Sequence, residues 1–239
     1  MRDLCDLHCH LLHGLDDGAK TLSETLEMAR LLVDLGFTAL APSPHNRPEY
    51  APTEVALRRL EEVQGELRSA GIALELHPNA ENFFLDDRLL PSLGTKEARL
   101  LGGGPYALVE APYAAPLPAL SELIFRIKLK GVIPLIAHPE RCYEFERPGR
   151  AAEAVQAGAC LQLDVGALIG RYGPKAKKVA VGLLEDNLYA VAATDLHSPR
   201  SVQWVGKALD QLRKLAGKER FQTLMKDNPR RMLAGKALL

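Results

Sequence analysis

Residues 3–18 read DLCDLHCHLLHGLDDG and open with a short segment in which polar side chains recur at every second position. Successive side chains of a β-strand point to opposite faces, so Asp6, His8 and His10 share one face of the strand that this pattern predicts. Two carboxylates, Asp16 and Asp17, follow in a turn flanked by glycines, which allow tight backbone conformations. The stretch therefore predicts a strand that ends in two histidines, with a carboxylate-bearing loop beside them.

The same kind of segment recurs along the chain. Short apolar runs bounded by Gly, Pro or polar residues are typical of buried strands, and seven are present: 3–10, 38–45, 73–81, 106–110, 132–138, 160–165 and 189–197. Helical periodicity lies between them, over 23–35, 53–70, 118–130, 150–157 and 174–185, with Ser23 and Thr53 as expected N-caps. Three further helical stretches, broken near Gly217 and Asn228, end the chain.

Strands that alternate with helices form parallel sheets. Seven such units in 239 residues predict an α/β fold of the distorted TIM-like (β/α)7 barrel type, one strand short of the eight-stranded form. A doubly wound open sheet is the alternative. The length suits one large domain, and no linker or repeat divides it.

The ends of the predicted strands carry the chemistry. In a parallel barrel all strand carboxyl ends open on one face, where residues distant in sequence meet. One strand-terminal His is more often a hydrogen-bonded core residue, but repetition at corresponding ends favours a metal site. Six of the seven runs end in His, Asp or Glu. These residues are His8 and His10, His45, Glu81, Glu110, His138, and Asp195 with His197.

Imidazole and carboxylate together suit Zn, Mn or Fe(II), and the candidates outnumber the ligands of one tetrahedral ion. We therefore expect two or three divalent ions. Asp6 is expected to orient a ligand histidine from outside the ligand set, and Asp16 to be solvated or a cap. His13 is interpreted as a loop residue, and His77 as a structural residue or as one that supports a ligand from behind.

Composition and the missing motifs argue against several functional classes. Lys+Arg and Asp+Glu both number 30, so no global charge favours nucleic acid or an anionic membrane. No apolar run could span a bilayer and the N-terminus lacks an apolar signal segment, so we expect a cytoplasmic protein. None of the four cysteines has Arg six positions later, as a cysteine-based phosphatase requires, and no Gly-x-Ser-x-Gly or Walker loop is present.

Several motifs occur in an order that resembles one family. DLHCHLLHGLDDGAK at 6–20 resembles the opening Asp-x-His-x-His motif of the PHP (polymerase and histidinol phosphatase) superfamily. Its Asp-Asp-Gly is similar to the CpsB/CapC/YwqE branch, the manganese-dependent bacterial tyrosine phosphatases linked to capsular and exopolysaccharide synthesis. Further matches are SPHNRPEY (43–50), PNAEN (78–82), LVEAPY (108–113), IAHPERC (136–142), TDLHSPRS (194–201) and NPRRMLAGK (228–236).

The resemblance implies one PHP phosphatase domain over residues 1–239, a seven-stranded barrel and a trinuclear site. Carried over position by position, the catalytic residues are Arg141, Arg200 and His45, and both arginines face the phosphate. One departure is Asn79-Ala80-Glu81, where the family has Gly-Asn-Glu. The implied metal ligands are His8, His10, Asp17, His45, Glu81, Glu110, His138, Asp195 and His197.

The expected function is phosphomonoester hydrolysis, in which a hydroxide bound to the metals attacks phosphorus in line. The positive charge of three divalent ions exceeds the negative charge of the four carboxylate ligands, so the site should attract phosphate. Manganese is the first expectation for the metal, with Fe or Zn as alternatives. The expected substrate is a phosphotyrosine protein, and a bacterial tyrosine kinase is the natural candidate. The alternatives are a small-molecule phosphatase such as histidinol phosphatase, a phosphodiesterase, or a non-catalytic metal-binding scaffold.

Overall fold

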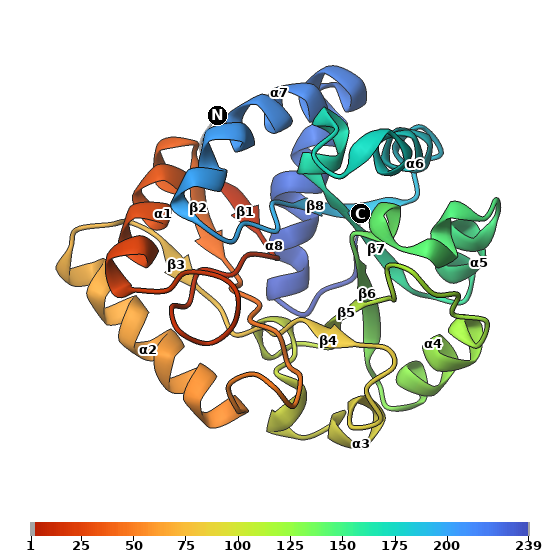
Figure 1. Cartoon of the computed structure of the whole chain (residues 1–239), viewed down its shortest axis with the longest axis horizontal. Coiled ribbons are helices and arrows are strands. Elements are labelled where there is room, and N and C mark those ends of the chain that lie inside the picture. The colour runs from red at the N-terminus through yellow and green to blue at the C-terminus, as the bar shows by residue number, and fades with distance from the viewer. Residues whose placement is uncertain (1–2, 239) are drawn as a thin grey trace.

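Parallel strands occupy the centre of the molecule. The computed structural model describes residues 3–238, and Figure 1 shows helices around the strands. Two parallel ladders run in chain order, β1-β2-β3 and β4-β5-β6-β7-β8. Their strands are β1 (Leu4–Asp6), β2 (Phe37–Leu40), β3 (Glu75–Leu76), β4 (Asn82–Phe83), β5 (Tyr106–Glu110), β6 (Ile133–Ala137), β7 (Cys160–Asp164) and β8 (Tyr189–Ala193).

Isolated contacts join the two ladders into a distorted barrel. A parallel bridge pairs His45 with Glu81 beyond the end of β3. On the other side the His10 amide donates to the Leu196 carbonyl at 2.8 Å, and the Asp195 amide donates to the His8 carbonyl at 2.9 Å. Seven of the eight strands overlap the seven predicted runs, and the additional strand, β4, begins directly after the run 73–81. The TIM-like barrel is thus confirmed, and its two junctions lie at residues expected to bind metal.

Most predicted helices are present, with corrected starts. The first begins after Thr21, whose side chain accepts the Glu24 amide, so the expectation that Ser23 is the cap is wrong. Thr53 is the first residue of its helix rather than its cap, and its hydroxyl donates to the Glu97 carbonyl at 3.4 Å. The helices are α1 (Leu22–Asp34), α2 (Thr53–Ser69), α3 (Leu89–Ser92), α4 (Leu120–Leu129), α5 (Arg150–Gln156), α6 (Gly173–Glu185), α7 (Pro199–Gln222) and α8 (Asn228–Leu233).

The C-terminal region follows the predicted breaks. Gly217 interrupts α7 with a φ of 76°, and a π-helical turn over Thr223–Asp227 leads into α8 at Asn228. Burial of Met232 beside Leu101 and Tyr106 places α8 across the amino-terminal end of the barrel, and α8 lies at the centre of the view in Figure 1. The barrel is therefore closed at the end opposite to the strand carboxyl ends.

Two apolar layers hold this arrangement. Alternate strand residues such as Leu7, Leu108 and Val191 fill the barrel interior, and the opposite strand faces pack against the surrounding helices. Full burial of a Leu or Val side chain contributes about 1.5–3 kcal/mol, so both layers fix the strand positions firmly. The strand ends consequently present their polar side chains from a rigid support.

Candidate metal centre

Four side chains from three segments converge at the carboxyl mouth of the barrel. His8 and His10 extend from the end of β1, Glu81 precedes β4, and Asp195 follows β8. Asp195 Oδ1 lies 3.2 Å from His8 Nε2 and 3.3 Å from His10 Nε2, and Glu81 Oε2 lies 3.4 and 3.5 Å from the same two nitrogens. Ligands about 2.1 Å from one tetrahedral ion stand ~3.4 Å apart, so these four atoms have the spacing of a metal shell.

Neighbouring groups fix which imidazole nitrogen faces this shell. Gln162 donates its Nε2 to the Leu163 carbonyl, so its Oε1 accepts from His8 Nδ1 at 2.8 Å. Asp16 Oδ2 accepts from His10 Nδ1 at 2.7 Å. Each Nδ1 therefore carries the proton, and each Nε2 presents a lone pair to the shell. Such partners are the usual means by which proteins orient ligand histidines.

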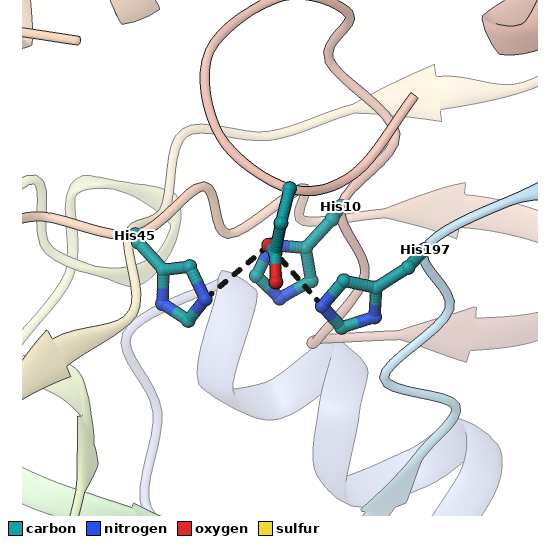
Figure 2. Close-up of side chains that lie close together, drawn as sticks. His10, His45 and His197 are labelled. Carbon is teal, nitrogen blue, oxygen red and sulfur yellow. Dashed lines mark ion pairs between the residues drawn. The ribbon is translucent and has the colours of Figure 1, made fainter. Parts of the chain in front are cut away.

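Two further groups of candidate metal ligands lie next to the group formed by His8, His10, Glu81 and Asp195. His138 Nε2 lies 3.0 Å from the other oxygen of Glu81 and 3.8 Å from Glu110 Oε1, which places Glu81 between two groups of ligands. Figure 2 shows His10, His45 and His197 around a carboxylate that is ion-paired with two of them. That carboxylate is Asp17, whose Oδ1 lies 3.4 Å from His45 Nε2 and 3.5 Å from His197 Nε2. The structure thus brings all nine residues that the resemblance implies into overlapping groups within 4.8 Å.

The donor set fits divalent transition metals. His8 Nε2, His10 Nε2 and Asp195 Oδ1 are buried without a hydrogen-bond partner among the described residues, and a cation would satisfy all three. Burial lowers the pKa of His45, but hydrogen bonds to Asp17 and Glu81 outweigh burial and raise the pKa to about 9. Protons and metal ions compete for such imidazoles. The mixture of imidazole and carboxylate suits Mn, Fe or Zn.

Strained backbone marks two of the ligand positions. His138 has a φ of 31° and Asp195 a φ of 49°, in the left-handed region that few residues other than glycine adopt. Both residues follow the ends of β6 and β8, and both side chains lie within the candidate ligand groups. Strained non-glycine residues cluster at functional sites because the surrounding structure holds them there.

The departure from the family pattern at Asn79-Ala80-Glu81 leaves the ligand position intact. Asn79 is buried and donates to the Leu7 carbonyl at 2.9 Å, which ties this segment to β1. Ala80 is fully buried, and Asn82 Nδ2 donates to the Leu108 carbonyl at 3.1 Å. Amides on either side therefore hold Glu81 in the shell.

Two arginines line a cavity of about 250 Å³ above these groups. The Arg141 guanidinium stands 4.9 Å from the ring centre of Tyr113 and 4.2 Å from that of Tyr172, and it contacts Asp164 at 3.3 Å and Asp195. Arg47 lies 4.7 Å from the ring centre of Phe83 and pairs with Glu110. Both cations are fixed in place and face the carboxylates.

Three residues lie in surroundings that the sequence did not anticipate. Arg200 is exposed as the second residue of α7 and does not line the cavity, so its contact with phosphate stays a prediction. Asp6 accepts from the His8 amide and from Thr194, so it orients the backbone of β1 and β8 rather than an imidazole. Asp16 is not solvated, because its side chain is fully buried against His10.

Several residues of the site carry little signal in the sequence. Gln162 and Asp164 lie on β7, which belongs to the one predicted run that ends in an apolar residue. The only signal for them is their spacing of two residues, which places both side chains on the same face of the strand. Arg47 sits inside a matched motif, but its loop gave no direction for the side chain. Tyr50 stacks 5.1 Å from the His45 ring and Tyr113 5.6 Å from the His138 ring, and both line the cavity.

A parallel barrel with overlapping His, Asp and Glu groups at its carboxyl mouth defines the class of metal-dependent barrel hydrolases. Within that class, residues 4–234 match the family model described as "Capsular polysaccharide synthesis, CpsB/CapC", and the chain belongs to this family.

Named relatives extend this result. The chain is 31% identical to tyrosine-protein phosphatase YwqE of Bacillus subtilis (strain 168) over 201 residues, which cover 83% of this chain and 79% of the relative. It is 25% identical to the putative tyrosine-protein phosphatase CapC of Staphylococcus aureus over 215 residues, or 89% and 84% of the two chains. The resemblance seen in the sequence is confirmed.

Solved structures agree on the fold. A structure from a study of YwqE from Bacillus subtilis and CpsB from Streptococcus pneumoniae, described as unique metal-dependent tyrosine phosphatases, matches with a TM-score of 0.91 and 28% identity. The match covers 99% of this chain and 96% of that chain. The organophosphorus hydrolase from Deinococcus radiodurans matches with a TM-score of 0.59 and 15% identity, covering 97% and 92%, which shows a shared barrel fold.

Proposed function

We propose that this protein is a metal-dependent protein-tyrosine phosphatase. One observation carries the proposal: candidate metal ligands, two arginines and two tyrosine rings line the same cavity of about 250 Å³. The metal ions and arginines would bind the phosphate group, and the tyrosine rings would stack against the phenyl ring of phosphotyrosine. The similarity to tyrosine-protein phosphatase YwqE and to the metal-dependent tyrosine phosphatase structure supports the same activity.

The nine candidate ligands would hold two or three divalent ions, with Mn as the first candidate and Fe or Zn as alternatives. When bound, such ions lower the pKa of water towards about 7 and neutralise phosphoryl oxygens. Gln162 and Asp16 keep His8 and His10 in the tautomer that ligation requires. His45 contributes from the loop after β2, where it also faces the cavity.

Arg141 and Arg47 would bind the phosphate from two sides. A guanidinium presents paired donors that match phosphoryl oxygens, and its charge stabilises the charge that develops during transfer. Arg141 is the better positioned of the two, because the rings of Tyr113 and Tyr172 hold its plane. Arg200 would join them only if the start of α7 turned towards the cavity.

The aromatic walls favour an aryl ester over an alkyl ester. Tyr50 and Tyr113 flank the cavity beside His45 and His138, and stacking against a substrate ring would position the phosphate. A phenolate leaving group, with a pKa of about 10, also needs less protonation than an alkoxide. An alkyl phosphate without a ring, such as glycerol phosphate, gains nothing from these rings, whereas histidinol phosphate could stack its imidazole but keeps the poorer alkoxide leaving group.

The natural substrate would be the phosphorylated tyrosine segment of a bacterial tyrosine kinase that controls capsule or exopolysaccharide synthesis, in the cytoplasm. The family description supports the link to capsular polysaccharide. A nucleic-acid phosphodiesterase would need a basic track, whereas the hollow beside the cavity carries Glu49, Asp86 and Asp87. No helix among residues 3–238 has the length and apolar character to cross a membrane.

The test compares an aryl with an alkyl phosphate on the Mn-loaded protein. We expect turnover of phosphotyrosine and p-nitrophenyl phosphate, slow turnover of glycerol phosphate, and loss of activity in His138→Ala and Arg141→Ala. Metal content of each variant, measured by elemental analysis, separates lost ligation from lost phosphate binding. Metal binding without turnover would favour a scaffold instead.

A further inference from the structure

A groove leads away from the candidate active-site cavity. A hollow of about 400 Å³ lies between the loop after β2 and the loop after β4, and among the described residues Arg47 is the one side chain that lines both this hollow and the cavity. The hollow continues past Asp86 and Asp87 into a second hollow of about 550 Å³ bounded by α3. We call the wall formed by Glu49, Phe83, Leu85, Asp86 and Asp87 the acidic groove.

The charges of the acidic groove are negative and partly unmatched. Asp86 is paired with Arg88, whose Nε lies 3.0 Å from Oδ1, and this hydrogen bond holds the pKa of Asp86 below its usual value. Glu49 and Asp87 are exposed, and neither forms an ion pair with any residue that the structure describes. Arg88 attracts Glu49 and Asp87 at longer range while it pairs with Asp86, so three carboxylates outnumber this one arginine. The acidic groove therefore keeps an excess of negative charge beside a cavity whose own charge is positive when metals are bound.

The floor of the acidic groove is apolar. Leu85 is 55% exposed, and the ring of Phe83 supports Arg47 on one face while it lines both hollows. A lysine or arginine side chain combines an aliphatic stem with a charged head. Its stem would rest on Phe83 and Leu85, and its head would reach Asp87 or Glu49.

We propose that the acidic groove binds the substrate segment next to the phosphotyrosine and selects a basic residue two or three positions away. We place the basic residue at this separation because Arg47 alone of the described residues stands between the groove and the cavity, and an extended residue spans about 3.3–3.6 Å. The inference rests on the proposed phosphatase function and specifies its substrate as a phosphotyrosine flanked by Lys or Arg.

Pairs of phosphopeptides test this inference. The two peptides of a pair differ only in carrying Lys or Glu two or three residues before or after the phosphotyrosine. We expect a roughly 2- to 30-fold preference in kcat/KM for Lys over Glu at one of these positions, expressed mainly in KM. This is the range that one exposed attraction, gained with Lys, and one exposed repulsion, suffered with Glu, supply together. The preference should shrink as salt rises, since exposed charges are screened over about 8–10 Å at 0.10–0.15 M salt.

Charge variants assign the preference to the groove. Glu49→Gln combined with Asp87→Asn should bring the ratio close to one, and Asp87→Lys should favour the Glu peptide. Glu27→Gln is the matched control, because Glu27 is an exposed carboxylate on α1 outside the groove, and it should leave the ratio unchanged. Thermal unfolding of each variant confirms that the fold is retained.

The outcomes separate the two proposals. If the wild type does not hydrolyse free phosphotyrosine, the phosphatase function falls and the groove proposal falls with it. If free phosphotyrosine is hydrolysed but Lys and Glu peptides react equally, only the groove proposal is refuted. A preference that survives in the Glu49→Gln, Asp87→Asn double variant refutes the groove proposal as well.

Discussion

Replacing Gln162 with leucine removes the group that fixes the tautomer of His8. The amide oxygen accepts from His8 Nδ1 at 2.8 Å, and both residues are fully buried. Leucine has a similar volume but no acceptor, so the imidazole can rotate or place its proton on Nε2. Either change removes the lone pair that faces Glu81 and Asp195.

The size of the effect follows from the lost contact. Loss of a partner that orients a metal-ligating histidine lowers metal affinity about 10- to 100-fold, which is about 1.4–2.7 kcal/mol. The metal-free protein should also lose about 1–3 kcal/mol of unfolding free energy, because His8 Nδ1 is left buried without an acceptor. The two losses have separate measurements and one structural cause.

Calorimetric titration with Mn measures the affinity, and urea unfolding of the metal-free protein measures the stability. Gln64→Leu is the matched control, since Gln64 donates to the Leu74 carbonyl and accepts the Leu76 amide far from any candidate ligand. The control should lose stability and keep its metal affinity. Unchanged Mn affinity in Gln162→Leu would refute the assignment of His8 Nε2 to a metal.

Four further predictions concern single substitutions at other positions. Gly18→Ala should weaken Mn binding at least tenfold, as the loss of an orienting partner does, because its Cβ would lie 2.3 Å from the His10 carbonyl oxygen. Gly65→Ala, in an uncrowded part of α2, should instead stabilise the fold by roughly 0.5–1 kcal/mol in urea unfolding. Arg141→Lys should lower kcat/KM for phosphotyrosine roughly 100-fold and weaken orthophosphate binding, because lysine lacks the paired donors and the stacking plane; near-normal values would contradict that role. A hydrogen bond to Lys226 lowers the pKa of Asp3, so Asp3 stabilises the fold above its unfolded pKa of about 3.9 and loses that contribution as pH falls through its lower folded value. Asp3→Asn should therefore cost ~0.2–1 kcal/mol at pH 7, as expected for a partly exposed pair, and in urea unfolding the difference from wild type should shrink as pH falls below about 4 and vanish only below the folded pKa of Asp3.

The ends of the strands were predictable because a strand fixes the direction of its side chains. Alternation placed His8 and His10 on one face, and parallel topology brought Glu110, His138 and Asp195 to the same mouth. The barrel followed from the same rhythm of runs and helices. Helix starts were less certain, since Thr21 and Ser23 are equally suitable caps in sequence and only the packing of α1 selects the first.

The loops resisted prediction because their side-chain directions depend on tertiary contacts. Asp16 and Asp17 are adjacent in sequence, yet one is buried behind His10 and the other faces His45 and His197. Arg47 turns towards Glu110 because Phe83 supports it from another segment, 36 positions later. No local periodicity encodes such choices.

The position of α8 leaves the ligands accessible from one end of the barrel. Met232 of α8 packs with Tyr106 and with the apolar side chains that fill the barrel beneath the ligands, so within residues 3–238 no path crosses the interior. Phosphoester, water, ions and released orthophosphate therefore enter and leave at the carboxyl ends of the strands. Any molecule bound at that mouth obstructs arrival and departure alike.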